Sequence, residues 1–119
     1  MGNPFVHGEL LTNDVGKAKS FYSKLFDWKL EDKDMGDKIY TLIKVGEGTG
    51  GGLMKNPMPN ASSLWVPYVL VDDVKAATMK AKSLGAKVMK DVSDVPDMGS
   101  FSVITDPTGA MFGLWEPKH

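Results

Sequence analysis

The chain carries the same short pattern twice, about half its length apart. Residues 11–18 read Leu-Thr-Asn-Asp-Val-Gly-Lys-Ala, and residues 70–77 read Leu-Val-Asp-Asp-Val-Lys-Ala-Ala. A second pair joins residues 52–55, Gly-Leu-Met-Lys, to residues 113–116, Gly-Leu-Trp-Glu. A repeat of this period indicates two copies of one supersecondary unit. Each candidate residue in one half therefore has a counterpart in the other half.

A chain of 119 residues has the usual size of one domain. We expect a single domain over residues 1–119, with a first module at 5–57, a linker at 58–63 and a second module at 64–117. Prolines at and beside the linker cannot donate a hydrogen bond to a sheet, which favours a solvated crossing there.

The composition excludes several classes of function. The chain has no cysteine, so it has no disulfide, thiolate nucleophile or cysteine metal site, and it suits a reducing compartment. Its 14 basic and 15 acidic residues give a net charge of −1 without a basic block, so we expect neither nucleic acid nor membrane as a partner. The sequence has no signal-peptide pattern at its start and no apolar stretch of about 20 residues, which predicts a cytoplasmic protein.

The first module reads as a strand, a helix and three further strands. Residues 5–12 alternate between two faces, as a strand does. Asn13 or Asp14 then caps a helix, and strands follow near 28–30, 38–45 and 52–55. The helical residues expected to face the sheet are Val15, Ala18, Tyr22, Leu25 and Phe26.

The second module repeats this order. Residues 64–71 form the strand, and Asp72 or Asp73 caps the helix. The apolar side of that helix carries Val74, Ala77, Ala81 and Leu84, and strands follow near 86–89, 101–105 and 110–115, with a hairpin turn at 106–109. Two βαβββ modules with one helix each predict an α+β domain.

The glycine-rich segment 46–52 resembles a phosphate-binding loop only superficially. It lacks the Lys-Ser/Thr pair of a P-loop, and no helical pattern follows it. A helix would be needed to direct backbone N–H groups at an anion. We therefore interpret the segment as a hairpin.

His7 and Glu9 are the most informative polar pair. They lie two residues apart on the first strand, so both side chains project to one face. That face is either a solvent-exposed polar stripe, the lining of a cavity, or part of the core. A cavity lining fits the few convergent polar groups that ligand pockets contain.

The repeat supplies the residues that correspond to this pair. It matches the two polar residues with Val66 and Tyr68, and it matches Met54 with Trp115. Tyr68 and Trp65 combine an apolar ring with a hydrogen-bond donor, which suits a pocket as well as it suits a core. The chain has eight methionines, so Met54 is equally consistent with core filling.

Two segments resemble the vicinal-oxygen-chelate superfamily, which includes glyoxalase I, the bleomycin-resistance proteins and the extradiol dioxygenases. The first is residues 14–28, Asp-Val-Gly-Lys-Ala-Lys-Ser-Phe-Tyr-Ser-Lys-Leu-Phe-Asp-Trp, and the second is residues 106–117, Asp-Pro-Thr-Gly-Ala-Met-Phe-Gly-Leu-Trp-Glu-Pro. The resemblance implies strands that curl into an open half-barrel. It also implies a homodimer, as in small members of the superfamily.

In metal-dependent members of this superfamily, four ligands come from the first and last strands of the two modules. The corresponding positions here are His7, Gly52, Val66 and Gly113, and only His7 has a side chain that can bind a metal. Glu9 could add an oxygen, but neighbours on one face of a straight strand splay apart. The resemblance therefore implies a site without a metal cofactor, unless His7 recruits a divalent ion through ligands outside the family pattern.

The two glycines at ligand positions have two interpretations. Gly52 and Gly113 either open space for a ligand at matching places in both halves, or sit at bends of their strands.

The leading hypothesis is a protein that binds a small organic molecule without a metal. His7 and Glu9 would make its polar contacts, and the remaining lining would come from Gly52, Met54, Trp65, Val66, Tyr68, Gly113 and Trp115. The alternative is a glyoxalase-type lyase or isomerase acting on a small carbonyl substrate, with Glu9 as general base and His7 orienting it. A third hypothesis is a domain that mediates protein contacts.

Overall fold

The computed structural model describes residues 2–34, 36, 39–58 and 60–118. The chain divides into two compact units, the first unit at residues 7–66 and the second unit at residues 1–6 and 67–119. The predicted beginning of a strand at residue 38 lies outside the described residues.

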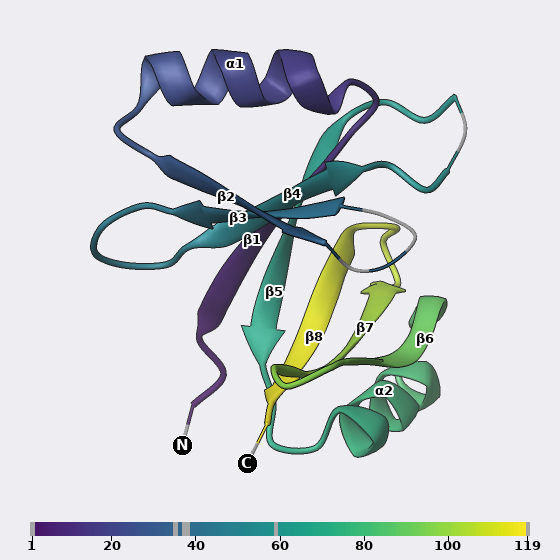
Figure 1. The fold of residues 1–119 in the computed structure, drawn as a ribbon. Coiled ribbons are helices and arrows are strands. Elements are labelled where there is room, and N and C mark those ends of the chain that lie inside the picture. The colour runs from purple at the N-terminus through teal and green to yellow at the C-terminus, as the bar shows by residue number, and fades with distance from the viewer. Residues whose placement is uncertain (1, 35, 37–38, 59, 119) are drawn as a thin grey trace. The chain divides into compact units, whose positions relative to one another are not determined.

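The first unit contains one helix and one sheet (Figure 1). The strand order in this sheet is β2-β3-β4-β1. β1 and β4 run parallel, and the other neighbours run antiparallel. The bounds are β1 Phe5–Thr12, α1 Val15–Leu25, β2 Lys29–Asp34, β3 Ile39–Lys44 and β4 Gly51–Lys55, so the first two residues of β1 fall in the second unit.

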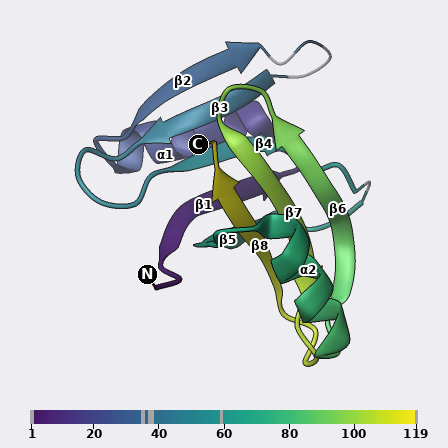
Figure 2. The same ribbon diagram turned by 90° about the horizontal axis from the view of Figure 1, so that it is seen from below.

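The second unit has the same topology. Its strand order is β6-β7-β8-β5, with β5 and β8 parallel and the other neighbours antiparallel. The helix α2 packs on β6, β7 and β8 (Figure 2). The bounds are β5 Leu64–Leu70, α2 Val74–Ser83, β6 Lys87–Val95, β7 Gly99–Thr105 and β8 Met111–Pro117, with the first three residues of β5 in the first unit.

This common topology confirms the two βαβββ modules and the α+β class. The register also confirms the correspondence derived from the repeat: Glu9 lies level with Gly52 across β1 and β4, and Tyr68 lies level with Gly113 across β5 and β8.

Both helices are capped by the aspartate that directly precedes valine in the repeated pattern. The Asp14 carboxylate accepts a hydrogen bond from the backbone N–H of Lys17 at 3.0 Å, and the Asp73 carboxylate accepts one from Ala76 at 3.0 Å. Each bond satisfies a donor that has no partner inside the helix. The duplicated motif thus encodes the strand-to-helix junction of each unit.

Each unit buries its own apolar core between helix and sheet. In the first unit Leu10, Ile43 and Leu53 are buried, and Val15, Ala18 and Tyr22 of α1 pack against them. In the second unit the buried residues are Val74, Ile104 and Leu114, with Ala77 and Ala81 of α2 packed against them.

Three apolar residues predicted to face a sheet are instead exposed. Leu25 is 55% exposed, Phe26 is 44% exposed and Leu84 is 68% exposed. Leu25 is the last residue of α1, while Phe26 and Leu84 follow the helix ends. The apolar spacing does not mark the helix ends, and beyond its last turn a helix no longer directs side chains toward the sheet.

β6 is longer than the sequence pattern indicated. It runs to Val95 instead of ending near residue 89. Two irregularities in its pairing with β7, between Val88 and Lys90 and between Lys90 and Ser93, break the alternation of side chains. A β-bulge adds a residue to one strand, so the alternation of apolar and polar residues that indicates a strand is interrupted at that point.

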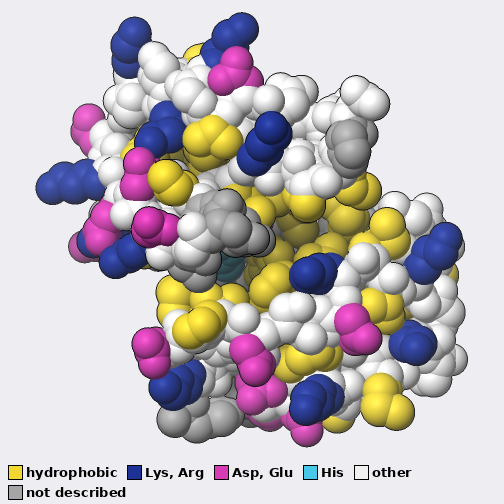
Figure 3. Space-filling view, turned by 45° about the vertical axis from the view of Figure 1, so that its right-hand side comes forward, with side chains coloured by type: hydrophobic (Ala, Val, Ile, Leu, Met, Phe, Trp, Pro, Cys, Tyr) yellow, Lys and Arg dark blue, Asp and Glu magenta, His cyan; other side chains and the backbone are white. Residues whose placement is uncertain are grey.

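Charged residues are distributed rather than clustered. On the face drawn in Figure 3, lysine and acidic side chains are interspersed, and hydrophobic side chains reach the surface among them. Neither helix in the described part of the chain is long and apolar enough to cross a membrane.

Candidate functional site

Three polar side chains of the first unit form a hydrogen-bonded triangle. His7 Nε2 lies 2.9 Å from Glu9 Oε1 and 2.9 Å from the hydroxyl oxygen of Tyr40. The Tyr40 hydroxyl donates to Glu9 Oε1 over 2.8 Å. β1 supplies the first two residues from one face, and β3 supplies the tyrosine.

Gly52 makes room for the tyrosine. A Cβ atom added to Gly52 would overlap the hydroxyl oxygen and ring of Tyr40. Gly52 belongs to β4, which lies between β1 and β3 in the sheet, so the tyrosine ring passes over the glycine to reach Glu9. The space beside this glycine is therefore filled by a side chain of the protein.

The protons of the triangle can be assigned from chemistry. The single hydroxyl proton of Tyr40 goes to Glu9 Oε1. For a charged Glu9, His7 must then be the donor in its own two contacts, so its Nε2 carries a proton. The network holds one carboxylate oxygen in place with two donors.

The other carboxylate oxygen is in a different situation. Glu9 is only 6% exposed, and its Oε2 is buried without a hydrogen-bond partner among the residues that the structure describes. Leaving a buried acceptor unpaired costs about 1–3 kcal/mol, and more when the group is charged. An O–H or N–H donor from a bound molecule would recover that energy.

The second unit has an aromatic residue at the equivalent place. Tyr68 is 8% exposed, and its ring lies where a Cβ atom on Gly113 would be. The ring also packs edge to face against Phe101, with centroids 6.1 Å apart. The two glycines of the repeat are thus both covered by tyrosine rings, but only the first unit places a carboxylate there.

The remaining predicted residues are divided between the two units. Met54 is partly buried and lies level with Leu11 in the first unit. Val66 is 1% exposed. Trp115 lies level with Phe101 in the second unit, two residues along β8 from the covered glycine.

Trp65 lies on the other side of the first unit's sheet from Glu9. Its ring packs edge to face against Tyr22 of α1, with centroids 5.5 Å apart, and its indole N–H donates to the Tyr22 hydroxyl over 3.3 Å. Tyr22 belongs to the helix-side core. Leu10 is in that core as well, so its neighbour Glu9 projects to the opposite face.

Tyr40 was missed by the sequence interpretation. It is an ordinary strand tyrosine in the sequence, and no motif distinguishes it. The only usable indication is Gly52 in the neighbouring strand, which becomes informative once the register of β3 and β4 is known.

The residues at the family's ligand positions do not fit a metal ion. Among residues 2–34, 36, 39–58 and 60–118, no three histidine, cysteine, aspartate or glutamate side chains come together as a metal site would require. Gly52 and Gly113 contribute no donor atom, and each is covered by a tyrosine ring. His7 Nε2 is already engaged with Glu9 and Tyr40.

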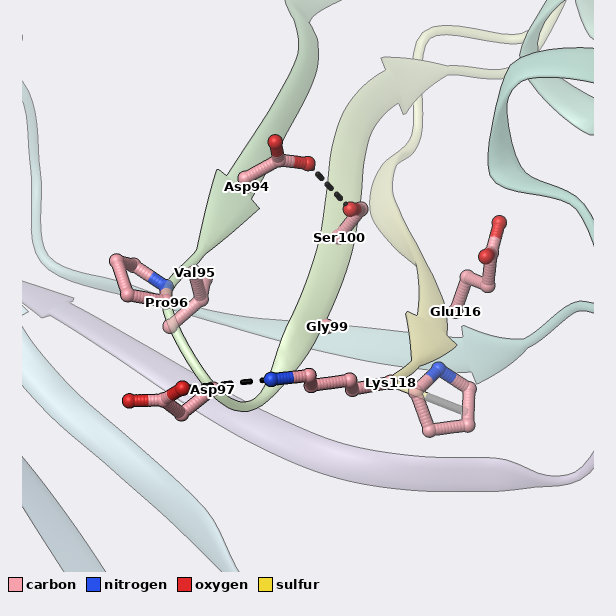
Figure 4. A pocket seen from close by; sticks show the side chains of 9 residues that line it. Asp94, Val95, Pro96, Asp97, Gly99, Ser100, Glu116 and Lys118 are labelled. Atoms are coloured by element: carbon pink, nitrogen blue, oxygen red, sulfur yellow. Dashed lines mark hydrogen bonds and ion pairs between the residues drawn. The ribbon is translucent and has the colours of Figure 1, made fainter.

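A cavity of about 340 Å³ lies in the second unit beside the β6–β7 hairpin. Its charged groups already have partners in the protein (Figure 4). Ser100 donates to Asp94 at 2.6 Å, Lys118 lies 3.3 Å from Asp97, and the Glu116 carboxylate accepts from the N–H of Val74 at 2.9 Å. These contacts stabilise the hairpin and the start of α2, which makes this cavity the weaker candidate.

Comparison with known proteins identifies the family. Residues 5–114 match the model of the Glyoxalase/Bleomycin resistance protein/Dioxygenase superfamily, and the chain belongs to that superfamily. The resemblance inferred from residues 14–28 and 106–117 is confirmed.

Two curated relatives are informative. The chain is 33% identical over 113 residues to a Mycobacterium tuberculosis protein named "Putative glyoxylase CFP32", which covers 94% of this chain. It is 28% identical over 126 residues to the anthracycline biosynthesis protein DnrV of Streptomyces peucetius. The chain spans only 43% and 44% of the lengths of these relatives.

Solved structures confirm the fold. Methylmalonyl-CoA epimerase from Mycobacterium tuberculosis superposes with a TM-score of 0.72 at 17% identity, covering 97% of this chain and 88% of that chain. The hypothetical protein BH1468 from Bacillus halodurans superposes with a TM-score of 0.75 at 12% identity, covering 100% of this chain and 97% of that chain.

Proposed function

We propose that this protein binds a small organic molecule through the carboxylate of Glu9, without the divalent ion of the metal-dependent members of its superfamily. The observation that carries the proposal is the arrangement of the two oxygens. Tyr40 and His7 hold Oε1, while Oε2 is buried and has no partner in the described part of the chain. A fixed acceptor of this kind selects a ligand that presents an O–H or N–H group.

The surroundings of Glu9 define the rest of the ligand. Leu42 of β3 lies level with Gly52 of β4. Leu11 and Met54 lie level with each other, two residues beyond Glu9 and Gly52 on β1 and β4. All three are partly buried apolar side chains on the Glu9 face. The ligand should therefore combine one donor group with an apolar body, as is usual for small-molecule sites.

The proposal is tested by NMR titration of the amide signals of Glu9, Gly52 and Tyr40. The probes are aliphatic alcohols, hydroxy ketones and amides, each compared with its O- or N-methylated analogue. We expect saturable shifts with the probes that carry an O–H or N–H group. Their methylated forms should bind at least about tenfold more weakly, a factor that corresponds to the free energy of one hydrogen bond. Equal shifts within each pair, or none with any probe, would reject the proposal.

Two variants sharpen this experiment. Glu9→Gln keeps the shape of the side chain but can place a donor where the free acceptor was, so it should abolish the preference for donors. Glu31→Gln is the matched control, because Glu31 lies in the same row of the sheet and pairs with exposed lysines. The independence from metal is tested by elemental analysis: stoichiometric zinc, nickel, manganese or iron that is lost in His7→Ala would overturn it.

A second candidate is an isomerase or lyase that uses Glu9 as a general base. It is favoured by the same buried carboxylate and by the relative named "Putative glyoxylase CFP32". Glu9 Oε2 would remove a proton from the carbon next to a carbonyl group, leaving an enolate, and would return it to that carbon. Where that carbon carries a hydroxyl group, transfer of the hydroxyl proton to the enolate oxygen would let Glu9 return its proton to the former carbonyl carbon instead, which completes an isomerisation.

Exchange of the α-hydrogens of hydroxyacetone in D2O separates the two candidates. An enzyme should accelerate the exchange, and Glu9→Gln should abolish the acceleration while Glu31→Gln preserves it. Binding without exchange identifies a binding protein. The homodimer and the cytoplasmic location expected from the sequence remain predictions.

A further inference from the structure

The helix side of the first unit contains a cavity that is separate from the Glu9 carboxylate. Its volume is about 170 Å³. We propose that it is a second ligand site, which takes one planar aromatic or heteroaromatic ring. The residues that line it are His7, Gly8, Trp28, Ile43, Val45, Thr49, Gly50, Gly51 and Trp65.

A missing side chain creates this cavity. Along β1, Gly8 belongs to the face that carries Leu10 toward the helix-side core, so a side chain at this position would fill the space. A Cβ atom on Gly8 would stand 3.9 Å from the ring of Trp65, an ordinary van der Waals contact, so the space beside Gly8 accepts a methyl group without overlap. Opposite Gly8 lies Gly51, whose absent Cβ would overlap the Gly8 carbonyl. Two level glycines therefore leave backbone as one side of the cavity.

Two tryptophans form the walls. The rings of Trp28 and Trp65 are nearly perpendicular, with centroids 6.3 Å apart and an interplanar angle of 79°. Both are held by Tyr22, which stacks on Trp28 at 5.7 Å and hydrogen-bonds the Trp65 indole. The walls are thus fixed before a ligand arrives, which lowers the entropic cost of binding.

The exposure of Trp65 supports a ligand at this place. Trp65 is 42% exposed, although its ring already contacts two other aromatic rings. A ring placed in the corner that the two perpendicular indoles form would meet one indole face to face and the other edge to face, the two arrangements that aromatic pairs prefer. It would also remove apolar surface from water.

The size and chemistry of the cavity limit the ligand. An engineered apolar cavity of about 150 Å³ in another protein binds benzene, so this space suits one ring or a small fused pair such as indole. Ile43 and Val45 complete an apolar lining, which disfavours a charged group. Thr49 and His7 are the residues with polar side chains in the lining, and they permit one polar substituent.

The site shares one lining residue, His7, with the Glu9 triangle, and its other lining residues lie outside that triangle. Gly8 and Glu9 are neighbours on β1 and project to opposite faces of the sheet. Variants can therefore be chosen that alter one site alone, and failure of one proposal leaves the other standing.

The test is an NMR titration with indole as the probe, following the indole N–H signals of all three tryptophans. We expect saturable shifts of Trp28 and Trp65, with Trp115 as the internal reference that stays unchanged. Gly8→Leu fills the cavity and should weaken binding at least about tenfold, a loss of about 1.4 kcal/mol. Glu31→Gln, a variant outside the cavity lining, should bind indole as the parent protein does.

Controls keep the result decisive. Gly16→Ala is the matched glycine control, because its added Cβ makes only an ordinary contact 3.8 Å from Asp14. If Gly8→Leu does not give a dispersed spectrum, Gly8→Ala replaces it and should weaken binding measurably. Shifts that do not saturate, that appear equally at Trp115, or that survive filling of the cavity would overturn the proposal.

Discussion

The two units share a backbone plan and differ in what their sheets carry on the face away from the helix. In the first unit that face holds a buried carboxylate, Glu9, bound by Tyr40 and His7. In the second unit the position equivalent to Glu9 is Tyr68, which packs on Phe101. Strand register depends on many backbone hydrogen bonds and on alternation, so it survives the replacement of any one side chain. A polar site depends on two or three side chains and can exist in one copy alone.

The largest expected effect tests what the units have in common. Gly52→Ala and Gly113→Ala should each destabilise the protein by about 3 kcal/mol, because the new methyl group overlaps a tyrosine ring in a packed region. Urea denaturation measures the loss. Gly16→Ala is the control and should not destabilise. If the free energy of unfolding of both variants falls by less than about 0.5 kcal/mol, close packing of a tyrosine ring on a glycine is not a feature that the two units share.

The next effect separates the units. Tyr40→Phe removes the hydroxyl that donates to Glu9 Oε1 but keeps the ring over Gly52. The carboxylate would then lose one of its two donors, at a cost of about 2 kcal/mol in the free energy of unfolding. Tyr40→Phe should also weaken any ligand bound at Glu9. Unchanged stability together with unchanged binding would remove Tyr40 from the site.

A smaller effect tests whether Glu9 is kept for function. Glu9→Met has a similar volume and eliminates the buried acceptor that lacks a partner in the described structure. Replacement of a poorly satisfied buried polar group by an apolar one is often neutral or favourable, so we expect stability to stay equal or to rise by about 1 kcal/mol. Ligand binding at Glu9 should disappear. A loss of more than about 2 kcal/mol would show that the carboxylate serves stability instead.

The smallest effect concerns Glu31, a partly exposed acid in the same row of the sheet as Glu9. Hydrogen bonds and charge from Lys44 and Lys33 lower the pKa of Glu31 from 4.5 to about 2. Because the folded pKa is the lower one, its stabilising contribution is present above pH 4.5 and is lost as the pH falls toward 2. NMR titration should show Lys44→Met moving this pKa back toward 4.5. Because the Glu31 side chain is 42% exposed to solvent, the effect on stability is slight and sensitive to salt.

Much of the fold was predictable from local patterns. The repeat identified both modules, and the aspartates at its centre correctly placed both helix starts. Leu25, Phe26 and Leu84 were misassigned because periodicity does not mark where a helix ends. β6 was cut short because its bulges interrupt the alternation on which strand prediction depends.

The candidate site was only half predictable. His7 and Glu9 follow from their spacing on one strand, because two-residue periodicity fixes a shared face. Tyr40 does not follow, since its contact with Glu9 depends on the order and register of three strands. Trp65 lies across the sheet from Glu9, and the cavity at Gly8 needs the helix and two tryptophans in place.

The sequence by itself determined the duplication, the βαβββ order, the helix caps and the superfamily, because each of these is written in contiguous residues. Only the tertiary structure decided that the two repeat glycines are covered by tyrosine rings and that Gly8 borders a cavity. It also decided that one oxygen of Glu9 is held by hydrogen bonds, while the other is buried without a partner among the described residues. Those features depend on which side chains meet across strands, and non-local packing sets that arrangement where local periodicity cannot.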